Sequence, residues 1–421
     1  MKHYQDYKKL FSLIFFGVFL IIPLAFSNAQ TAQELQNKIN QKDADIAKLE
    51  EEIRIYQIEL GNIGEQKNSL SKSIKELDLT KKKLVVDINI TQTKIDKTNL
   101  RIQSLSSDIG AKQNSIENDV ESISLGIRDT YELEENNILE TILSKNDFTA
   151  VWNDIDNIVA IREKIREKIL ELKEIKSELE DTREETISAK NELVLLKSKL
   201  SDQQKIVIQN TNEKNKLLIQ TKNSEANYQK LLKDQLAKKA AFERELEGYE
   251  SQLKFILDPS KIPSGRILGW PLDSIFVTSP YAPRWGGFHR GTDFRAPVGT
   301  PVKSVADGIV KGVGDTDICC PKASFGKWIF IEHNNGLSST YAHLSLSKVK
   351  VGQQVARGAV IGYSGNTGSS TGPHLHLSLY VSSGVKVDSF DSKSYPGKTL
   401  TQPISATNAY LDPMNYLPPY K

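Results

Sequence analysis

Four of the six histidines of the chain fall in three short segments near its C-terminus. Residues 289–293 read His-Arg-Gly-Thr-Asp, residues 341–343 read Tyr-Ala-His, and residues 372–376 read Gly-Pro-His-Leu-His. Alternate side chains of a β-strand share one face, so His374 and His376 would point toward the same site. Together with another histidine and an aspartate, they could give zinc three protein ligands and leave a fourth position for a water molecule. The C-terminal third therefore looks like a hydrolase.

Each of these segments is weak evidence when taken alone, because a His-x-His pair in a strand is more often simply polar. Their combination, in this order, indicates a metal site. The other histidine of this region, His333, precedes an Asn-Gly pair at residues 335–336 that predicts a hairpin turn. We expect His333 to face solvent beside that turn and assign it no catalytic role. The chain has no His-Glu-x-x-His segment, which excludes the common helical zincin arrangement.

Residues 266–417 resemble the lysostaphin-type (LytM-type) zinc metallopeptidases, which cut the peptide part of bacterial peptidoglycan. The resemblance is carried by residues 289–294, 299–302, 306–308, 341–345, 362–368 and 371–376. It implies His289, Asp293 and His376 as zinc ligands. It implies His343 and His374 as two catalytic histidines that do not bind the metal. Some relatives lack these residues and only activate other wall hydrolases, whereas all five are present here.

The residue types fit hydrolysis. Zinc held by two neutral imidazoles and a carboxylate remains a Lewis acid and lowers the pKa of a bound water to about 7. Histidine has an unperturbed pKa of about 6.5 and exchanges protons near neutrality. His343 and His374 could therefore divide water activation and charge stabilisation between them, in either assignment. The five intact positions favour a zinc endopeptidase of peptidoglycan over the alternative, a non-enzymatic activator of other murein hydrolases acting through its helices and groove.

The region around these motifs is predicted to be mostly β. Short segments rich in β-formers, separated by Gly, Asn-Gly and Pro, are residues 298–313, 328–333, 337–343 and 375–381. About 150 residues are enough to bury a core. We expect an antiparallel zinc-peptidase domain at residues 266–421, after a linker at 256–265. Cys319 and Cys320 lie in a loop-like stretch, where a structural role as thiols is favoured over a strained vicinal disulfide.

Residues 30–255 form a long charged region that is poor in Gly and Pro. Its apolar residues follow alternating steps of three and four over residues 35–116 and again over 155–200. A sustained 3.5-residue repeat predicts a left-handed coiled coil. The repeat breaks at about 123–155, which predicts a helical tip between two arms. We expect an antiparallel coiled-coil hairpin, with a parallel homodimer as the alternative.

The predicted fold class is thus α+β multidomain, a coiled-coil hairpin followed by a β zinc-peptidase domain. The helical region resembles, more weakly, that of EnvC-like cell-division factors, which suggests a membrane-bound division or wall-synthesis regulator as its partner. Residues 131–153 mix apolar and acidic side chains. They could dock on the groove and restrain the enzyme, or they could simply pack the hairpin tip. No other segment stands out as an inhibitor.

Composition and the N-terminus bear on partners and location. A formal net charge of +2 over 421 residues gives no electrostatic case for binding nucleic acid. Basic residues precede an apolar run at residues 10–26, and small residues follow at 27–29. This pattern predicts a signal peptide over residues 1–29, with an uncleaved membrane anchor as the alternative. Either one places the zinc domain beyond the cytoplasmic membrane, in the periplasm or cell wall, where peptidoglycan lies.

Overall fold

The computed structural model describes residues 32–420, except for residues 65–68, 136–147, 254, 256, 259, 261 and 285–286. The signal peptide predicted at 1–29 and much of the predicted tip therefore lie outside the described residues. Within the described part of the chain, no helix is long and apolar enough to cross a membrane. The chain divides into two compact units, one of Met1–Gln41 with Asn99–Ala189 and one of Lys42–Thr98 with Lys190–Lys421.

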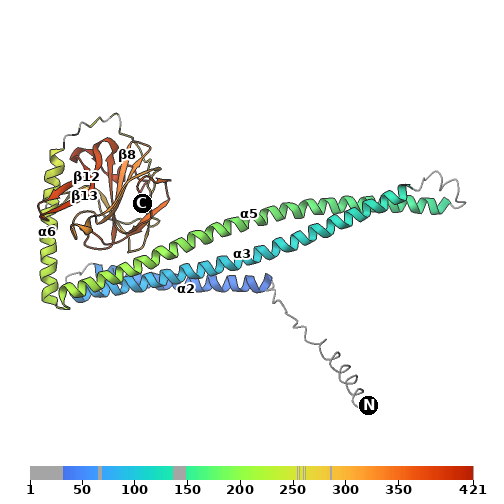
Figure 1. Ribbon diagram of the computed structural model, residues 1–421, viewed down its shortest axis with the longest axis horizontal. Helices are drawn as coiled ribbons and strands as arrows, with labels where there is room; N and C mark the ends of the chain where they lie inside the picture. Colours follow the sequence, from blue (N-terminus) through green and yellow to red (C-terminus); the bar gives the residue numbers. More distant parts are fainter. Residues whose placement is uncertain are drawn as a thin grey trace, which may run out of the picture. The chain divides into compact units, whose positions relative to one another are not determined.

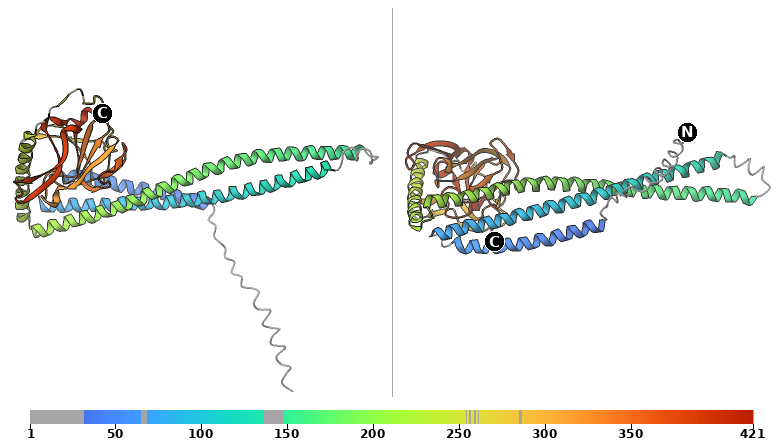
Figure 2. Two further views of the ribbon diagram at one scale, coloured as in Figure 1. Left: turned by 45° about the horizontal axis from the view of Figure 1, so that its top comes forward. Right: turned by 60° about the horizontal axis from the view of Figure 1, so that its bottom comes forward.

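The described helices are α2 (Ala32–Gly64), α3 (Leu70–Glu135), α5 (Phe148–Thr221) and α6 (Glu225–Gln252). α3 and α5 run antiparallel and side by side (Figures 1 and 2). In the first unit Arg101 pairs with Glu185 at 2.6 Å, and in the second Lys214 pairs with Asp78 at 2.5 Å. The predicted antiparallel hairpin is confirmed, and its arms pair within one chain.

The first arm differs from the prediction because its repeat is divided between two helices. α2 ends at Gly64, and α3 begins at Leu70 and runs back along α2. Ile46 of α2 packs with Val86 and Ile90 of α3, and Lys97 pairs with Asp43 at 2.5 Å. The continuous repeat hid this reversal, since each of two paired helices also needs an apolar stripe. The glycines at positions 61 and 64 weaken the helix where it ends.

The second arm also ends earlier than predicted. Lys222 and Asn223 have φ values of 50° and 54°, in the left-handed region, and they terminate α5. Ser224 is extended and is the N-cap residue of α6. α6 is therefore a separate helix, which lies beside β12 and β13 (Figure 1).

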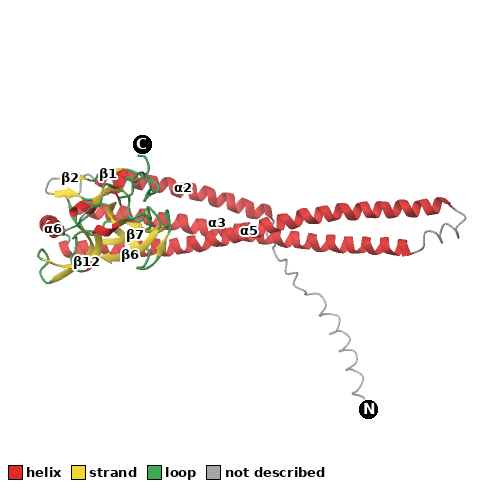
Figure 3. Cartoon of the chain, turned by 90° about the horizontal axis from the view of Figure 1, so that it is seen from above, coloured by secondary structure: helices red, strands yellow, loops and turns green. Residues whose placement is uncertain are grey.

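The strands of the C-terminal region are β1 (Val277–Ser279), β2 (Ala282–Arg284), β3 (Gly287–His289), β4 (Thr292–Arg295), β5 (Pro301–Lys303), β6 (Gly308–Asp315), β7 (Lys327–His333), β8 (Leu337–Ser347), β9 (Gln354–Val355), β10 (Val360–Ser364), β11 (His374–Val381), β12 (Val385–Ser392), β13 (Lys398–Ser405) and β14 (Tyr410–Leu411). The main sheet has the order β1-β4-β11-β8-β7-β6-β9, with β10 beside β8 and β5, and β14 beside β11. Its strands are seen in Figure 3. Every pairing is antiparallel, as predicted.

The strand β7 shows how alternation fills the core. Ile329 and Ile331 are fully buried in the main cluster, and His333 lies two residues further along the same face. The expectation that His333 faces solvent is therefore wrong, because its strand phase turns it inward. His333 is 4% exposed, and its Nε2 lies 2.8 Å from Ser339 Oγ. Burial lowers the pKa of His333 to about 4. The predicted Asn-Gly turn does join β7 to β8, with Gly336 at φ 81°.

β12 and β13 form a separate two-stranded hairpin that packs against α6. Phe242 of α6 is 1% exposed and stacks on Phe390 of β12, with ring centroids 6.1 Å apart. Cys320 is buried in the same cluster, and Cys319 and Cys320 are both free thiols. Glu245 of α6 accepts hydrogen bonds from residues 392–394, at the end of β12 and in the turn that follows it. α6 is thus held by apolar packing and by the hydrogen bonds that the Glu245 carboxylate accepts.

Candidate metal centre

Strand register brings three of the five predicted site residues together. β11 lies between β4 and β8, with Asp293 directly opposite His376 on one side and Ala342 opposite it on the other. His289 is the last residue of the short strand β3 and is 6% exposed. The side chains of His289, Asp293 and His376 each offer one ligand atom, and these atoms lie within 4.8 Å of one another.

The distances among these atoms suit one metal ion. His289 Nε2 lies 3.1 Å from Asp293 Oδ1 and 3.1 Å from His376 Nδ1, and His376 Nδ1 lies 2.8 Å from Asp293 Oδ1. Tetrahedral ligands with bonds of about 2.0–2.1 Å stand roughly 3.3 Å apart. The observed triangle is slightly tighter than that, so a small outward shift would admit an ion.

The outer hydrogen bonds of the two histidines fix which nitrogen is free. His289 Nδ1 lies 2.8 Å from Pro280 O, a carbonyl that can only accept, so Nδ1 carries the proton. Ser378 Oγ donates to Arg290 O, so the hydroxyl accepts from His376 Nε2–H at 2.8 Å. Both inward nitrogens therefore carry lone pairs next to the Asp293 carboxylate. Three such acceptors facing one another form a set that fits a metal ion.

Arg284 of β2 holds the other oxygen of the aspartate. Its Nη2 donates to Asp293 Oδ2 at 2.8 Å and also to Ser279 Oγ. This contact leaves Oδ1 as the oxygen that faces His289 and His376. Oδ1 is therefore the carboxylate oxygen that is placed to bind a cation.

His343 reaches the same pocket through an irregularity in β8. Between the pairs Ile329–Tyr341 and Lys327–Leu344 the register of β7 with β8 shifts. His343 lies in this bulge at φ 60°, a left-handed conformation that is uncommon for a non-glycine residue. Its Nδ1 donates to Thr367 O at 2.8 Å, so Nε2 is the unprotonated nitrogen.

His374 is two residues before His376 on β11, and both side chains line the pocket, as their spacing predicted. Its Nδ1 donates to Gly372 O at 2.7 Å, which leaves Nε2 unprotonated, 3.6 Å from Asp293 Oδ1. The rings of His343 and His374 are 4.6 Å apart. Burial lowers the pKa of His343, His374 and His376, so all three favour the neutral form.

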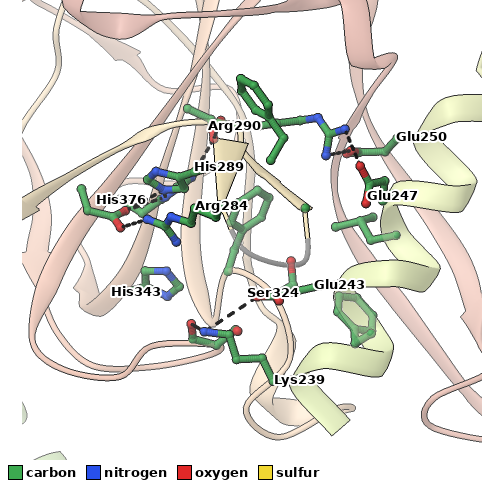
Figure 4. Close-up of a pocket in the computed structure, with 18 of the residues that line it drawn as sticks. Lys239, Glu243, Glu247, Glu250, Arg284, His289, Arg290, Ser324, His343 and His376 are labelled. Carbon is green, nitrogen blue, oxygen red and sulfur yellow. Dashed lines mark hydrogen bonds and ion pairs between the residues drawn. The ribbon is translucent and has the colours of Figure 1, made fainter. Parts of the chain in front are cut away.

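The pocket at this centre has a volume of about 440 Å³ and is lined on one side by α6. Figure 4 shows the helix facing the histidines, with Lys239, Glu243, Glu247 and Glu250 directed toward the β domain. The lining residues of α6 are Lys239, Phe242, Glu243, Leu246, Glu247 and Glu250. Their spacing of three and four residues places them on a single helical face. Residues 131–153 were predicted from the sequence as a possible cover of the groove, and most of them lie outside the described residues. No such role was predicted for the residues of α6.

The structure adds functional neighbours that the motifs did not reveal. Arg284 contacts Asp293, and Ser378 contacts His376, although neither lies in one of the three histidine motifs. Ser378 could have been found, because it follows His374 and His376 on the same strand face at the next alternate position. Arg284 could not, because its contact depends on how β2 packs beside β4.

Comparison with known proteins agrees with this geometry. Peptidase family M23 matches residues 287–389, a segment that contains all five predicted site residues. This segment is an M23 peptidase domain. The catalytic domain of the antimicrobial peptidase lysostaphin from Staphylococcus simulans is 31% identical to this chain, covering 33% of this chain and 90% of that one, with a TM-score of 0.25.

Curated relatives match over about a third of the chain. The peptidoglycan DD-endopeptidase ShyA of Vibrio cholerae is 42% identical over 142 residues, which are 33% of this chain and 30% of that protein. The DD-carboxypeptidase/endopeptidase Mpg of Neisseria meningitidis is 38% identical over 146 residues, which are 33% of this chain and 32% of that protein. The matches thus span about a third of the length of these relatives.

Proposed function

We propose that this chain is an exported, zinc-dependent endopeptidase that hydrolyses peptide bonds of peptidoglycan in wall remodelling or daughter-cell separation. The observation that carries the proposal is the convergence of ligand atoms from His289, Asp293 and His376 in one pocket. The M23 domain and the relatives named as peptidoglycan endopeptidases support the substrate class.

In this proposal His289, Asp293 and His376 hold the zinc ion. Bound there, zinc would supply Lewis acidity, polarising the scissile carbonyl and lowering the pKa of a water molecule to about 7. His343 and His374 offer unprotonated Nε2 atoms, because each Nδ1–H is bound to a backbone carbonyl. One of the two accepts the proton of the attacking water and returns it to the leaving amine. The other, if it takes up a proton from solvent at Nε2, would donate a hydrogen bond from that nitrogen to the developing oxyanion.

The helical region is proposed to regulate this site, with α6 as the element that restrains it. α6 lines the pocket with six residues of one face and is anchored by Phe242 and Glu245. While α6 is packed there, access of a peptide chain to the pocket is reduced in proportion to the closed population. A membrane-bound division or wall-synthesis regulator that binds only the open form, through the coiled coil, would raise activity by shifting that population.

Export is proposed from the N-terminal sequence. Lys2, Lys8 and Lys9 precede the apolar run at residues 10–26, and Ser27, Asn28 and Ala29 follow it. This is the order of a signal peptide, or of an anchor if it is not cleaved. The proposed substrate lies on the far side of the cytoplasmic membrane, so location and chemistry agree.

A digest of purified peptidoglycan tests the function. The chain without residues 1–29 is incubated with peptidoglycan, with and without a zinc chelator, and the released fragments are analysed by mass spectrometry. Peptide cross-links that are cut without chelator, spared with it and cut again after zinc is returned are the expected result. If cross-links stay intact and fragments appear only when another wall hydrolase is added, the chain is the non-enzymatic activator instead.

A further inference from the structure

The guanidinium of Arg290 lies on the pocket side of the β domain and meets two carboxylates of α6 (Figure 4). Its Nη2 is 3.4 Å from Glu247 Oε1, and its Nη1 is 3.7 Å from Glu250 Oε2. The guanidinium also stacks over the ring of Tyr410, with its carbon 5.6 Å from the ring centroid. Among the described residues, both ion-pair partners of Arg290 come from α6, so the arginine faces no carboxylate of its own domain.

The backbone of Arg290 is fixed to the metal centre. Its carbonyl accepts the hydroxyl of Ser378, which in turn accepts from the ligand His376. Gly291 lies so close to His376 that a Cβ there would stand 2.5 Å from the imidazole Cε1. The guanidinium is therefore carried by a segment that is tightly packed against a metal ligand. A group bound by Arg290 would be held at a set distance from the proposed zinc ion.

The two carboxylates that meet Arg290 differ in character. Glu250 is 2% exposed, and Tyr410 donates a hydrogen bond to its Oε1 at 2.6 Å, so this carboxyl is an anchor of α6. The side chain of Glu247 is 42% exposed and makes one long contact with the guanidinium. Arginine binds a carboxylate best through two parallel N–H donors, a geometry that neither glutamate provides. A free carboxylate in the place of Glu247 could form this bidentate pair.

We propose that Arg290 binds a carboxylate of the substrate peptide beside the scissile bond, and that Glu247 of α6 occupies this subsite while α6 is packed. The proposal rests on the peptidoglycan function proposed above and deepens it, since the substrate is then an anionic peptide. Peptidoglycan peptides carry free carboxyl groups, and walls in which these groups are amidated offer a neutral counterpart of the same shape. Arg290 would favour the charged form.

The plain structural alternative is that Arg290 serves only to hold α6 through Glu250. Both roles predict that Arg290→Gln loosens α6, so overall activity cannot separate them. They differ in substrate preference. A structural arginine leaves the ratio of rates on charged and amidated peptides unchanged, whereas a subsite arginine sets that ratio.

The test therefore uses the full chain carrying Phe242→Asp, which places a charge in the apolar cluster under α6 and opens the pocket. Two cross-linked muropeptide dimers serve as probes, one with free carboxyl groups and one with the same groups amidated. We expect a higher kcat/KM for the free-carboxyl dimer, by roughly 10- to 100-fold, the effect of a charge-assisted hydrogen bond. Adding Arg290→Gln should abolish this preference, and Arg290→Lys should keep part of it.

Arg295→Gln is the matched control, because Arg295 is an exposed arginine on β4 whose guanidinium stacks over Phe276 and does not line the pocket. It should keep the full preference. Zinc content is measured in every variant and should stay at one ion per chain. If Phe242→Asp proves unfolded by circular dichroism, Glu247→Gln in the otherwise unchanged chain replaces it and should raise the rate on the free-carboxyl dimer more than on the amidated one.

Equal rates on the two dimers, or a preference that survives Arg290→Gln, would overturn the proposal and leave the endopeptidase function standing. Failure to cut either dimer with zinc bound would reject the endopeptidase function itself, and the subsite with it. Loss of zinc from Arg290→Gln would show that the residue supports the metal centre rather than the substrate.

Discussion

The metal centre and α6 line opposite sides of one pocket, but the sequence reveals them to very different degrees. The centre is built from short motifs on neighbouring strands, where alternation and register place each side chain. The pocket face of α6 is built from ordinary helical residues. Its position depends on contacts with a hairpin more than 140 positions away in the chain, such as the hydrogen bond from Lys393 N to Glu245. A metal site requires particular residue types, whereas a helix that packs over a pocket requires only a surface complementary to that pocket.

The largest effect is expected from removing one of the proposed metal ligands. His376→Ala should abolish zinc binding and lower peptidoglycan cleavage by on the order of 1,000-fold, because the Lewis acid is lost. Zinc content by atomic absorption and cleavage of peptidoglycan are measured on the same preparation. His333→Gln is the control, since His333 is a buried histidine of the same sheet outside the centre. Full activity of the zinc-free variant would disprove the assignment.

Removing a histidine that does not hold the metal should separate binding from turnover. His343→Ala should keep one zinc per chain and lose roughly 100-fold or more in kcat, because proton transfer or oxyanion stabilisation is removed. Its Nδ1 contact with Thr367 O orients the ring but supplies no ligand. Calorimetry gives zinc affinity, and steady-state kinetics on muropeptide dimers give kcat. Unchanged turnover would show that His343 has no part in the chemistry.

A smaller effect is expected from the titration of Glu250, which should change how firmly α6 packs. Burial raises the pKa of Glu250 to about 7, above the 4.5 of an exposed glutamate, against the opposing contacts of Tyr410 and Arg290. The packed state therefore binds the proton more tightly than the released state. The contribution of Glu250 to the free energy of packing of α6 is complete below about pH 4.5. It is lost as the pH rises through about 7. The restraint should weaken by roughly tenfold between pH 6 and pH 8.

The measurement is the rate of the unchanged chain divided by that of Phe242→Asp at each pH, which cancels the pH dependence of the chemistry itself. Glu250→Gln mimics the protonated carboxyl, so the ratio should then stay flat at its low-pH value. A ratio that rises equally with and without Glu250→Gln would mean that another group controls the packing of α6.

Much of the β domain could be predicted because its signals are local. The spacing of His374 and His376 placed both on one strand face, and the Asn-Gly pair predicted the β7–β8 turn, as found. The burial of His333 was not predicted, because the prediction relied on the neighbouring Asn-Gly turn and not on the alternation of side chains along β7. The bulge that aims His343 into the pocket has no signature in one sequence, since it arises from register between two strands.

For the helices, the sequence predicted the pairing of the arms but not where each helix ends. The 3.5-residue repeat predicted a coiled coil, and two arms of similar length separated by a break predicted the antiparallel hairpin that α3 and α5 form. The same repeat continues through the reversal between α2 and α3. A local stop signal was present at Asn223 and Ser224, where an asparagine in the left-handed region precedes the N-cap residue of α6. The contact of Glu245 with residues 392–394 joins segments that no local pattern relates.

Three full chains compared on purified peptidoglycan would show whether a metal-dependent endopeptidase site is restrained by α6. Phe242→Asp places a charge against Phe390, whereas the matched control Leu236→Asp places it on the exposed side of the same helix, where Leu236 is 51% exposed. Burying an unpaired charge is strongly unfavourable, so Phe242→Asp should raise zinc-dependent release of cleaved cross-links by roughly tenfold or more. The unchanged chain and Leu236→Asp should stay equally slow. Equal rates in all three chains, or no chelator-sensitive cleavage in any, would contradict restraint of such a site by α6.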